Sequence, residues 1–453
     1  MRPLFNPDTP TWKVFLIFLG PLLLSNILQS LSGTLNSVFL GHMIGVSALA
    51  AASAFFPMML FLISFIMGLG SGSSVLIGQA WGAREPERVR EVAGTTLTCG
   101  LIGGATVGLL GALFAPQLLA MLRTPPDILP MAIPYARVML ASMPLLFVFL
   151  LLTSMLRGVG DTVTPLYALI VSTLVGLIVT PTLIAGWIGL PRLGVIGPAG
   201  GAIASFVLTL AWLSWHLHRK GHTLALDAKL LRHLHINGPI LRQVLRIGVP
   251  TAMQMVIMSL AEVALLSIVN GFGSDATAAY GIGNQVLGYA QFPAMSIAIA
   301  ASILGAQAIG AGQLDRLGSI TRTGILINIV VTGSLLLLGY LFARPIIGMF
   351  TTHHETTDIA MRLLYIVLWS TLAFGAAAVI SGVMRASGTV MAPVLLSIGA
   401  ILLVEVPVAV LLSRRIGLDG VWMSWPCAFI AMLVFQSLYY RLVWRKKKIE
   451  RIR

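Results

Sequence analysis

Twelve long apolar segments constrain this chain more than any other feature. A transmembrane helix needs about 20 consecutive, mostly apolar residues. Lipid offers no partners to backbone N–H and C=O groups, so each segment must satisfy them internally, which predicts helices. An all-α membrane protein is therefore expected. The predicted spans are residues 14–36, 47–75, 92–115, 131–154, 164–187, 196–217, 245–270, 277–304, 319–342, 359–383, 393–413 and 420–441.

The composition excludes a soluble protein. Hydrophobic residues make up 57% of the 453 residues and charged residues 10%, whereas soluble domains carry about 25% charged residues. A soluble fold of this length could not hide so much apolar surface. The two cysteines, Cys99 and Cys427, both lie in apolar segments and match neither a disulfide framework nor metal-site spacing.

The positions of the basic residues predict the orientation in the membrane. Of the 29 Lys and Arg residues, 22 lie in the termini and in the connections on the side of the N-terminus, and seven lie on the other side. Cytoplasmic segments are enriched in Lys and Arg, so both termini are expected in the cytoplasm of a bacterial-type cell with the chain in its inner membrane. The net charge of +14 then faces anionic membrane lipid, and no nucleic-acid partner is expected.

Internal repeats relate the two halves of the chain. "IGQAWGA" (77–83) matches "GAQAIGA" (305–311), and "GVSALAA" (45–51) matches "GSDATAA" (273–279). Likewise, "RGVGDTVTP" (157–165) matches "RASGTVMAP" (385–393), and every pair is separated by 228 residues. Six spans per half is an even number, so the halves enter the membrane from the same side as parallel repeats.

The longest polar stretch divides these halves. The predicted organisation is a six-helix bundle over residues 1–218, a cytoplasmic linker over 219–244, and a second six-helix bundle with a basic cytoplasmic tail over 245–453.

Two carboxylates fall well inside predicted spans. Glu262 lies in "VIMSLAEVALLSIV" and Glu405 in "ILLVEVPVAVLL". A carboxylate at bilayer depth costs about 2.5–3.5 kcal/mol, so it normally faces a cavity or a partner. Low dielectric disfavours its charged form, which lets it exchange a proton for a cation. The alternatives are structural: Glu262 could hydrogen-bond a neighbouring helix, and Glu405 could satisfy the turn disrupted by Pro407.

Amide side chains form a second set of candidates. Span one places its amides at spacings typical of one helix face, and such a face is expected to meet water or a partner rather than lipid. Spans seven and eight carry further amides, with Gln254 about two turns before Glu262. The alternative role for each amide is hydrogen bonding between helices. The candidate cavity-lining amides are Asn26, Gln29, Asn36, Gln254, Asn284, Gln285 and Gln291.

The chain resembles the multidrug and toxic compound extrusion (MATE) family. The resemblance rests on six plus six spans, on "GQAWGA" and "GAQAIGA" after spans two and eight, and on the motifs at 157–165 and 385–393. It implies two bundles that form a V-shaped central cleft. It also implies a secondary antiporter that exports organic, usually cationic, compounds in exchange for protons or sodium ions.

One position departs from the family pattern. Many members carry an Asp near the end of span one, whereas this chain has Asn36 at the matching position. An amide can bind a cation through its carbonyl oxygen but cannot titrate. The resemblance therefore shifts the coupling role to Glu262, which lies in the span where one branch of the family carries a Glu, and to Glu405.

Two rival functions stay open at this point. One is a lipid or polysaccharide flippase of the same superfamily. The other is a membrane enzyme or receptor, against which stand the parallel repeats. Because no nucleotide-binding motif appears, an ion gradient is expected to drive transport. We expect no cofactor and no enzymatic activity, and we expect a monomer that binds small organic molecules and membrane lipid.

Overall fold

The structure, a computed structural model, describes residues 10–187, 189, 191–351 and 353–452, and in these ranges the regular elements are helices. The first half contains α1 (Thr11–Met43), α2 (Val46–Gly82), α3 (Pro86–Leu113), α4 (Ala115–Met121), α5 (Leu129–Ala141), α6 (Met143–Gly158), α7 (Val163–Ala185), η1 (Gly194–Ile196), α8 (Gly197–Arg219) and α9 (Ala228–Leu231). The second half contains α10 (Gly238–Asn270), α11 (Ser274–Gly310), α12 (Arg316–Leu341), α13 (Ala343–Gly348), α14 (His354–Val367), η2 (Leu368–Ser370), α15 (Thr371–Ala386), α16 (Met391–Ala400), η3 (Ile401–Glu405), α17 (Val406–Ile416), α18 (Leu418–Trp422), α19 (Ser424–Leu442) and η4 (Trp444–Lys446).

Among the described residues, eleven helical segments are long and apolar enough to cross a membrane, and the bent pair α5 and α6 supplies a twelfth. The predicted all-α, twelve-span fold is thus confirmed. Several helices extend beyond their apolar stretch. Helix α10 begins at Gly238 rather than at the predicted residue 245, and α2 ends at Gly82 rather than at the predicted residue 75. Hydropathy marks the part of a helix at bilayer depth, whereas the backbone hydrogen bonds continue into the polar layer.

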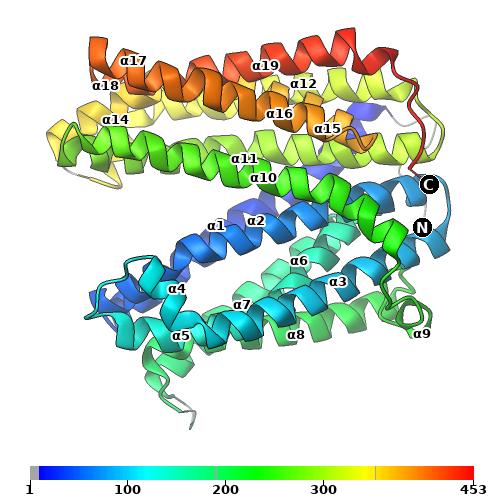
Figure 1. Ribbon diagram of the computed structural model, residues 1–453, viewed down its shortest axis with the longest axis horizontal. Helices are drawn as coiled ribbons and strands as arrows, with labels where there is room; N and C mark the ends of the chain where they lie inside the picture. The colour runs from blue at the N-terminus through cyan, green and yellow to red at the C-terminus, as the bar shows by residue number, and fades with distance from the viewer. Residues whose placement is uncertain (1–9, 188, 190, 352, 453) are drawn as a thin grey trace. The chain divides into compact units, whose positions relative to one another are not determined.

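The chain forms two compact units whose boundaries fall inside helices. One unit comprises Leu24–Ala252, and the other comprises Met1–Leu23 together with Met253–Arg453. Helices α1 and α10 are therefore each divided between the units. In the first unit, α6 packs against α2 and α3, and α7 packs against α8. In the second, α11 packs against α12, α14 and α15, while α16 and α17 lie alongside α19 (Figure 1).

The backbone carries the 228-residue repeat that the motifs predict. Left-handed φ angles recur at matched positions, at Gly45 (118°) and Gly273 (105°), and at Gly160 (95°) and Gly388 (78°). Helices α2 and α11, which follow the first of these pairs, both contain 37 residues. The two halves therefore share the same turns as well as the same number of spans.

The fourth span of each half is interrupted at the same repeat position. The first half bends by 47° between α5 and α6, at Ser142. The hydroxyl of Ser142 donates to the Met139 carbonyl at 2.6 Å, and the matched Ser370 hydroxyl donates to the Val367 carbonyl at 2.5 Å. Pro144, at the start of α6, lacks the N–H that would continue the helix.

Candidate functional site

Glu405 lies where its helix changes its winding. It is the last residue of η3, a π-helical turn between α16 and α17, and Pro407 follows two residues later. A proline leaves a backbone carbonyl of the preceding turn without its donor, and π-helical turns recur at functional sites. The side chain of Glu405 is only 6% exposed.

Three side chains lie near the Glu405 carboxyl group. The Trp425 side chain lies beside it, and Glu262 lies close enough to repel it when both are charged. Tyr280 lies close enough to feel the charge of both carboxylates. The structure therefore brings together the two acids that the sequence singled out, one from α10 and one from the α16–α17 span.

Glu262 is the accessible member of this acid pair. Its side chain is exposed, although Ala261 and Leu265 on the same helix are buried. The Tyr280 hydroxyl donates to the Glu262 backbone carbonyl at 3.2 Å, and this hydrogen bond ties α11 to α10 beside the carboxylate. The pair thus joins one exposed carboxylate with one that is buried.

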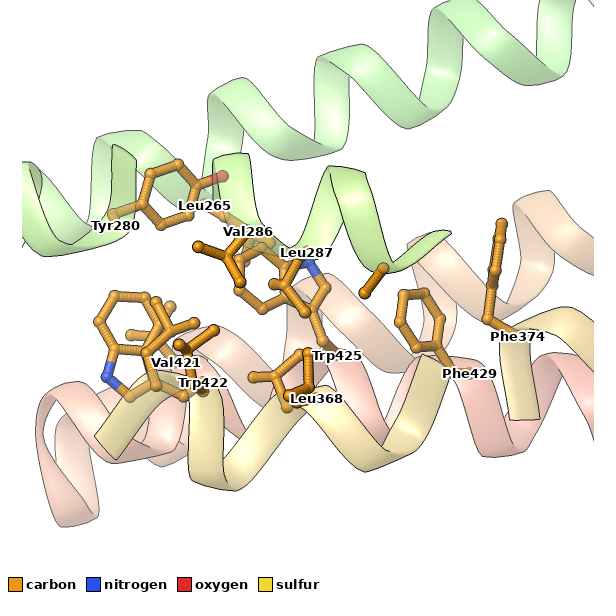
Figure 2. Packing of buried hydrophobic residues seen from close by; sticks show 14 of the residues in the cluster. Leu265, Tyr280, Val286, Leu287, Leu368, Phe374, Val421, Trp422, Trp425 and Phe429 are labelled. Carbon is orange, nitrogen blue, oxygen red and sulfur yellow. The ribbon is translucent and has the colours of Figure 1, made fainter. Parts of the chain in front are cut away.

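An aromatic cluster lies beside the acid pair. The rings of Tyr280, Trp422 and Trp425 stack on one another, with centroids 5.7 to 6.3 Å apart. They belong to a larger buried cluster that includes Leu368, Phe374 and Phe429 (Figure 2). Large side chains packed in this way hold the Trp425 indole where it meets Glu405.

This arrangement can hold a single positive charge. Two carboxylates close together in a low-dielectric setting repel each other, which favours either a proton on one of them or a cation beside both. The hydrogen bond from Tyr280 to the Glu262 backbone ties α11 to α10 beside the pair, and Trp425 lies beside Glu405. The described residues contain no group of three or more His, Cys, Asp or Glu side chains that could hold a metal ion.

The amides of spans seven and eight lie in the same unit as the acid pair. Gln285 is exposed and donates to the Tyr289 hydroxyl at 2.9 Å, while Gln254, Asn284 and Gln291 are half-buried. Within the described residues, the structure records no hydrogen bond from these four amides to either carboxyl group. Their predicted role as cavity-lining residues stays a prediction.

The amides of span one lie in the other unit, Leu24–Ala252. Asn26 is half-buried and Gln29 is exposed. Asn36 lies within α1, but its side chain is outside the part of the structure that is described. The structure therefore does not join these amides to Glu262 and Glu405 in one unit.

Sequence reasoning missed the aromatic partners of the acid pair. Trp422 and Trp425 are three residues apart on successive helices of the last span, and Tyr280 lies 18 residues after Glu262. The signal that could have found them was the pair of tryptophans, because an indole N–H in a membrane span needs an acceptor.

Comparisons with known proteins agree on one family. The MatE family model matches residues 21–182 and 250–411. The chain is 45% identical to the probable multidrug resistance protein YoeA of Bacillus subtilis, over 97% of this chain and 96% of that protein. It is 24% identical to the multidrug export protein MepA of Staphylococcus aureus, over 96% and 95% of the two chains.

Solved structures support the fold. A crystal structure of the Vibrio cholerae MATE transporter VcmN superposes with a TM-score of 0.89 at 22% identity, over 97% of this chain and 98% of that one. Another MATE crystal structure gives the same TM-score and identity over 98% of each chain. At this level of identity the similarity carries the helical architecture alone.

Proposed function

This chain belongs to the MatE family of transporters, and from that premise we propose that it exports organic cations across the inner membrane in exchange for protons or sodium ions. The names of its relatives, a multidrug resistance protein and a multidrug export protein, support efflux of several compounds. None of these relatives is described as a lipid or polysaccharide flippase, so the alternative has no support. The protein is a transporter rather than an enzyme.

The acid pair is the observation that carries the proposed coupling. A deprotonated Glu262 attracts an organic cation, and a proton or sodium ion that binds at Glu262 and Glu405 removes that attraction. Glu262 is exposed and therefore meets the substrate, while the buried Glu405 adds a second negative charge that favours a cation or a proton at the pair. Alternating access to the two sides of the membrane then turns this competition into exchange.

The orientation follows from the basic residues. Both termini face the cytoplasm because 22 of the 29 Lys and Arg residues lie on their side of the membrane. We further propose that the protein acts as a monomer, since Glu262, Glu405 and their aromatic partners all come from one unit of one chain.

Proton release on addition of tetraphenylphosphonium to the purified protein tests this proposal. We expect release from the wild type and at least a tenfold smaller release from Glu262→Gln, in line with coupling free energies of about 1–3 kcal/mol. Glu405→Gln is expected to reduce release in the same direction. Glu355→Gln removes an exposed carboxylate from α14 and serves as the control that should behave as wild type.

Each other outcome has a definite meaning. Release that survives in Glu262→Gln would overturn its assignment as the exchange site. Absence of release, with bound tetraphenylphosphonium displaced by sodium alone, would make the carrier sodium-coupled. Absence of both release and binding would overturn export of organic cations.

A further inference from the structure

The first residues of the segment that follows α19 pack against the rest of the protein. Trp444 is 2% exposed, and its indole N–H donates to the Ser387 hydroxyl at 3.0 Å. Its ring stacks on Tyr440 with centroids 5.1 Å apart, and the Tyr440 hydroxyl lies 3.1 Å from that of Thr321 on α12. Trp444 therefore fixes the segment directly to the α15–α16 turn, and through Tyr440 to α12.

The same turn holds the segment near its end. Gly388 has a φ of 78°, and a Cβ atom at this position would lie 2.8 Å from Cδ1 of Ile452. The Ile452 side chain therefore rests directly on the glycine backbone. Residues 445–451 are held between two anchors, Trp444 and Ile452, that both rest on the 385–393 motif.

The anchored segment displays positive charge. The five basic side chains Arg441, Arg445, Lys446, Lys447 and Lys448 are exposed. Glu450 is the acid of this segment, and its carboxylate pairs with Lys448 at 2.9 Å. The Lys447 ammonium lies 5.8 Å from the centre of the Tyr439 ring, which keeps that charge close to α19. The segment is thus a cationic surface with a defined geometry.

The position of this surface along α19 points to lipid. Val434, Leu438 and Leu442 are exposed and recur every four residues, so they form an apolar stripe along one helix face. Arg441 and Arg445 lie at and just beyond the end of α19 where this stripe stops. Figure 1 shows the C-terminal segment (red) leaving that end of α19. An apolar stripe that runs into cations matches a lipid, whose acyl chain ends in its headgroup.

The internal repeat shows that the docking is part of the fold while the charge is particular to the C-terminus. Trp444 corresponds to His216, which stacks on Trp212 with centroids 4.9 Å apart, as Trp444 stacks on Tyr440. Ile452 corresponds to Leu224, which is fully buried. Between these anchors, the first half has "LHRK" at 217–220 where the C-terminus has "RKKK" at 445–448.

We propose that residues 441–452, which comprise the last two residues of α19 and the docked segment after it, form a binding site for the headgroups of anionic phospholipids. The anchors hold the cations at headgroup depth, where each Lys or Arg contributes about a fivefold change in affinity for an anionic surface. Because Trp444 and Ile452 rest on the α15–α16 turn, a bound headgroup stabilises that turn as well. The site lies apart from the acid pair, so this proposal stands independently of the coupling mechanism.

Lipid binding by the purified full-length protein tests the proposal, with phosphatidylglycerol and phosphatidylcholine as probes. Arg445→Gln with Lys446→Gln removes two exposed cations of the site. Arg414→Gln with Arg415→Gln removes two exposed cations from the end of α17, which the length of α19 separates from the site, and is the matched control. We expect the first variant to weaken phosphatidylglycerol binding by about thirtyfold, and the control to bind as the wild type does.

Further variants test whether charge is what the ligand recognises and whether binding requires the docked segment. Lys446→Arg keeps the charge and is expected to retain binding. Trp444→Ala and, separately, Ile452→Ser undock one anchor each and are expected to weaken binding with all cations in place. The proposal would be overturned if the Arg445/Lys446 variant bound phosphatidylglycerol as well as the Arg414/Arg415 control does. It would also be overturned if the wild type bound phosphatidylcholine as tightly as phosphatidylglycerol, or if inorganic phosphate competed at concentrations similar to those of the lipid.

Discussion

Arg84 occupies a backbone conformation that its repeat counterpart assigns to glycine. Its φ is 61°, and Gly312, 228 residues later, has a φ of 72°. A side chain in this left-handed region costs about 1 kcal/mol relative to glycine. We expect Arg84→Gly to raise the free energy of unfolding by about 1 kcal/mol and Gly312→Ala to lower it by about the same amount. Thermal unfolding in detergent measures both, and Arg84→Ala, which removes the charge but keeps the strain, should leave stability unchanged.

His222 makes the packing of the linker onto the protein, here called its docking, depend on pH. It is 3% exposed, and its Nδ1 accepts a hydrogen bond from the Leu224 N–H at 3.1 Å. Burial lowers the pKa of His222, Lys220 and His216 act in the same direction, and Asp161 opposes them. As pH falls below about 6.5, the undocked linker takes up a proton that the docked linker resists. Docking therefore weakens towards low pH and levels off below the pKa of the docked state.

Hydrogen exchange of the backbone amides of residues 217–226 measures this effect. After correction for intrinsic exchange, we expect less protection at about pH 5.5 than at about pH 7.5. His222→Asn cannot titrate and should remove the difference. An unchanged pH dependence in that variant would assign the effect to another group, of which His216 is the nearest candidate.

The sequence predicted the two acids of the candidate site but not the aromatic residues beside them. Glu262 and Glu405 are identifiable because a carboxylate at bilayer depth is costly and therefore rare. Tyr280 and Trp425 are ordinary residues for a membrane helix. Their role depends on which helices pack together. Tyr280, 18 residues after Glu262, and Trp425, 20 residues after Glu405, become neighbours of these acids only in the folded unit.

Among the helices, Asn328 stabilises the interruption of the tenth span. It is fully buried in α12, and its Nδ2 donates to the Leu372 carbonyl at 3.1 Å, just after the 3₁₀ turn η2. We expect Asn328→Leu to lower stability by about 1–2 kcal/mol, because the Leu372 carbonyl loses a donor in a setting without water. Thr332→Val removes only the hydrogen bond to Asn328 Oδ1 and should cost less. Equal thermal midpoints for Asn328→Leu and the wild type would contradict this role.

The same region shows why hydropathy predicts spans better than their internal geometry. The prediction of a fourth span over 131–154 located α5 and α6 but gave no bend. The repeat position of Pro144 is Leu372, so the first half loses a backbone N–H and bends, while the second half keeps it and remains one span. The bend thus coincides with the loss of one backbone donor, which hydropathy does not register.

For the whole molecule, the division of α1 and α10 between the units has a physical basis in close helix packing. In the unit Leu24–Ala252, a Cβ atom on Gly248 of α10 would lie 2.8 Å from the Gly68 carbonyl oxygen of α2. The backbones thus touch, as small residues allow in membranes. Each half of the sequence therefore supplies a helical segment to the unit built mainly by the other half.

Because of this exchange, we expect the two parts of the chain to stay associated when the linker between them is broken. Leu231 and Arg232 are both exposed, so we expect fragments 1–231 and 232–453, expressed together, to purify as one complex through an affinity tag on either. The second fragment carries Gly238–Ala252, which completes the unit of the first, and the first carries Thr11–Leu23, which completes the unit of the second. Gly248→Leu, which forces α10 away from α2, should weaken co-purification. Fragments that fold separately and do not associate would contradict the exchange, because each unit would then be complete without the segment from the other half.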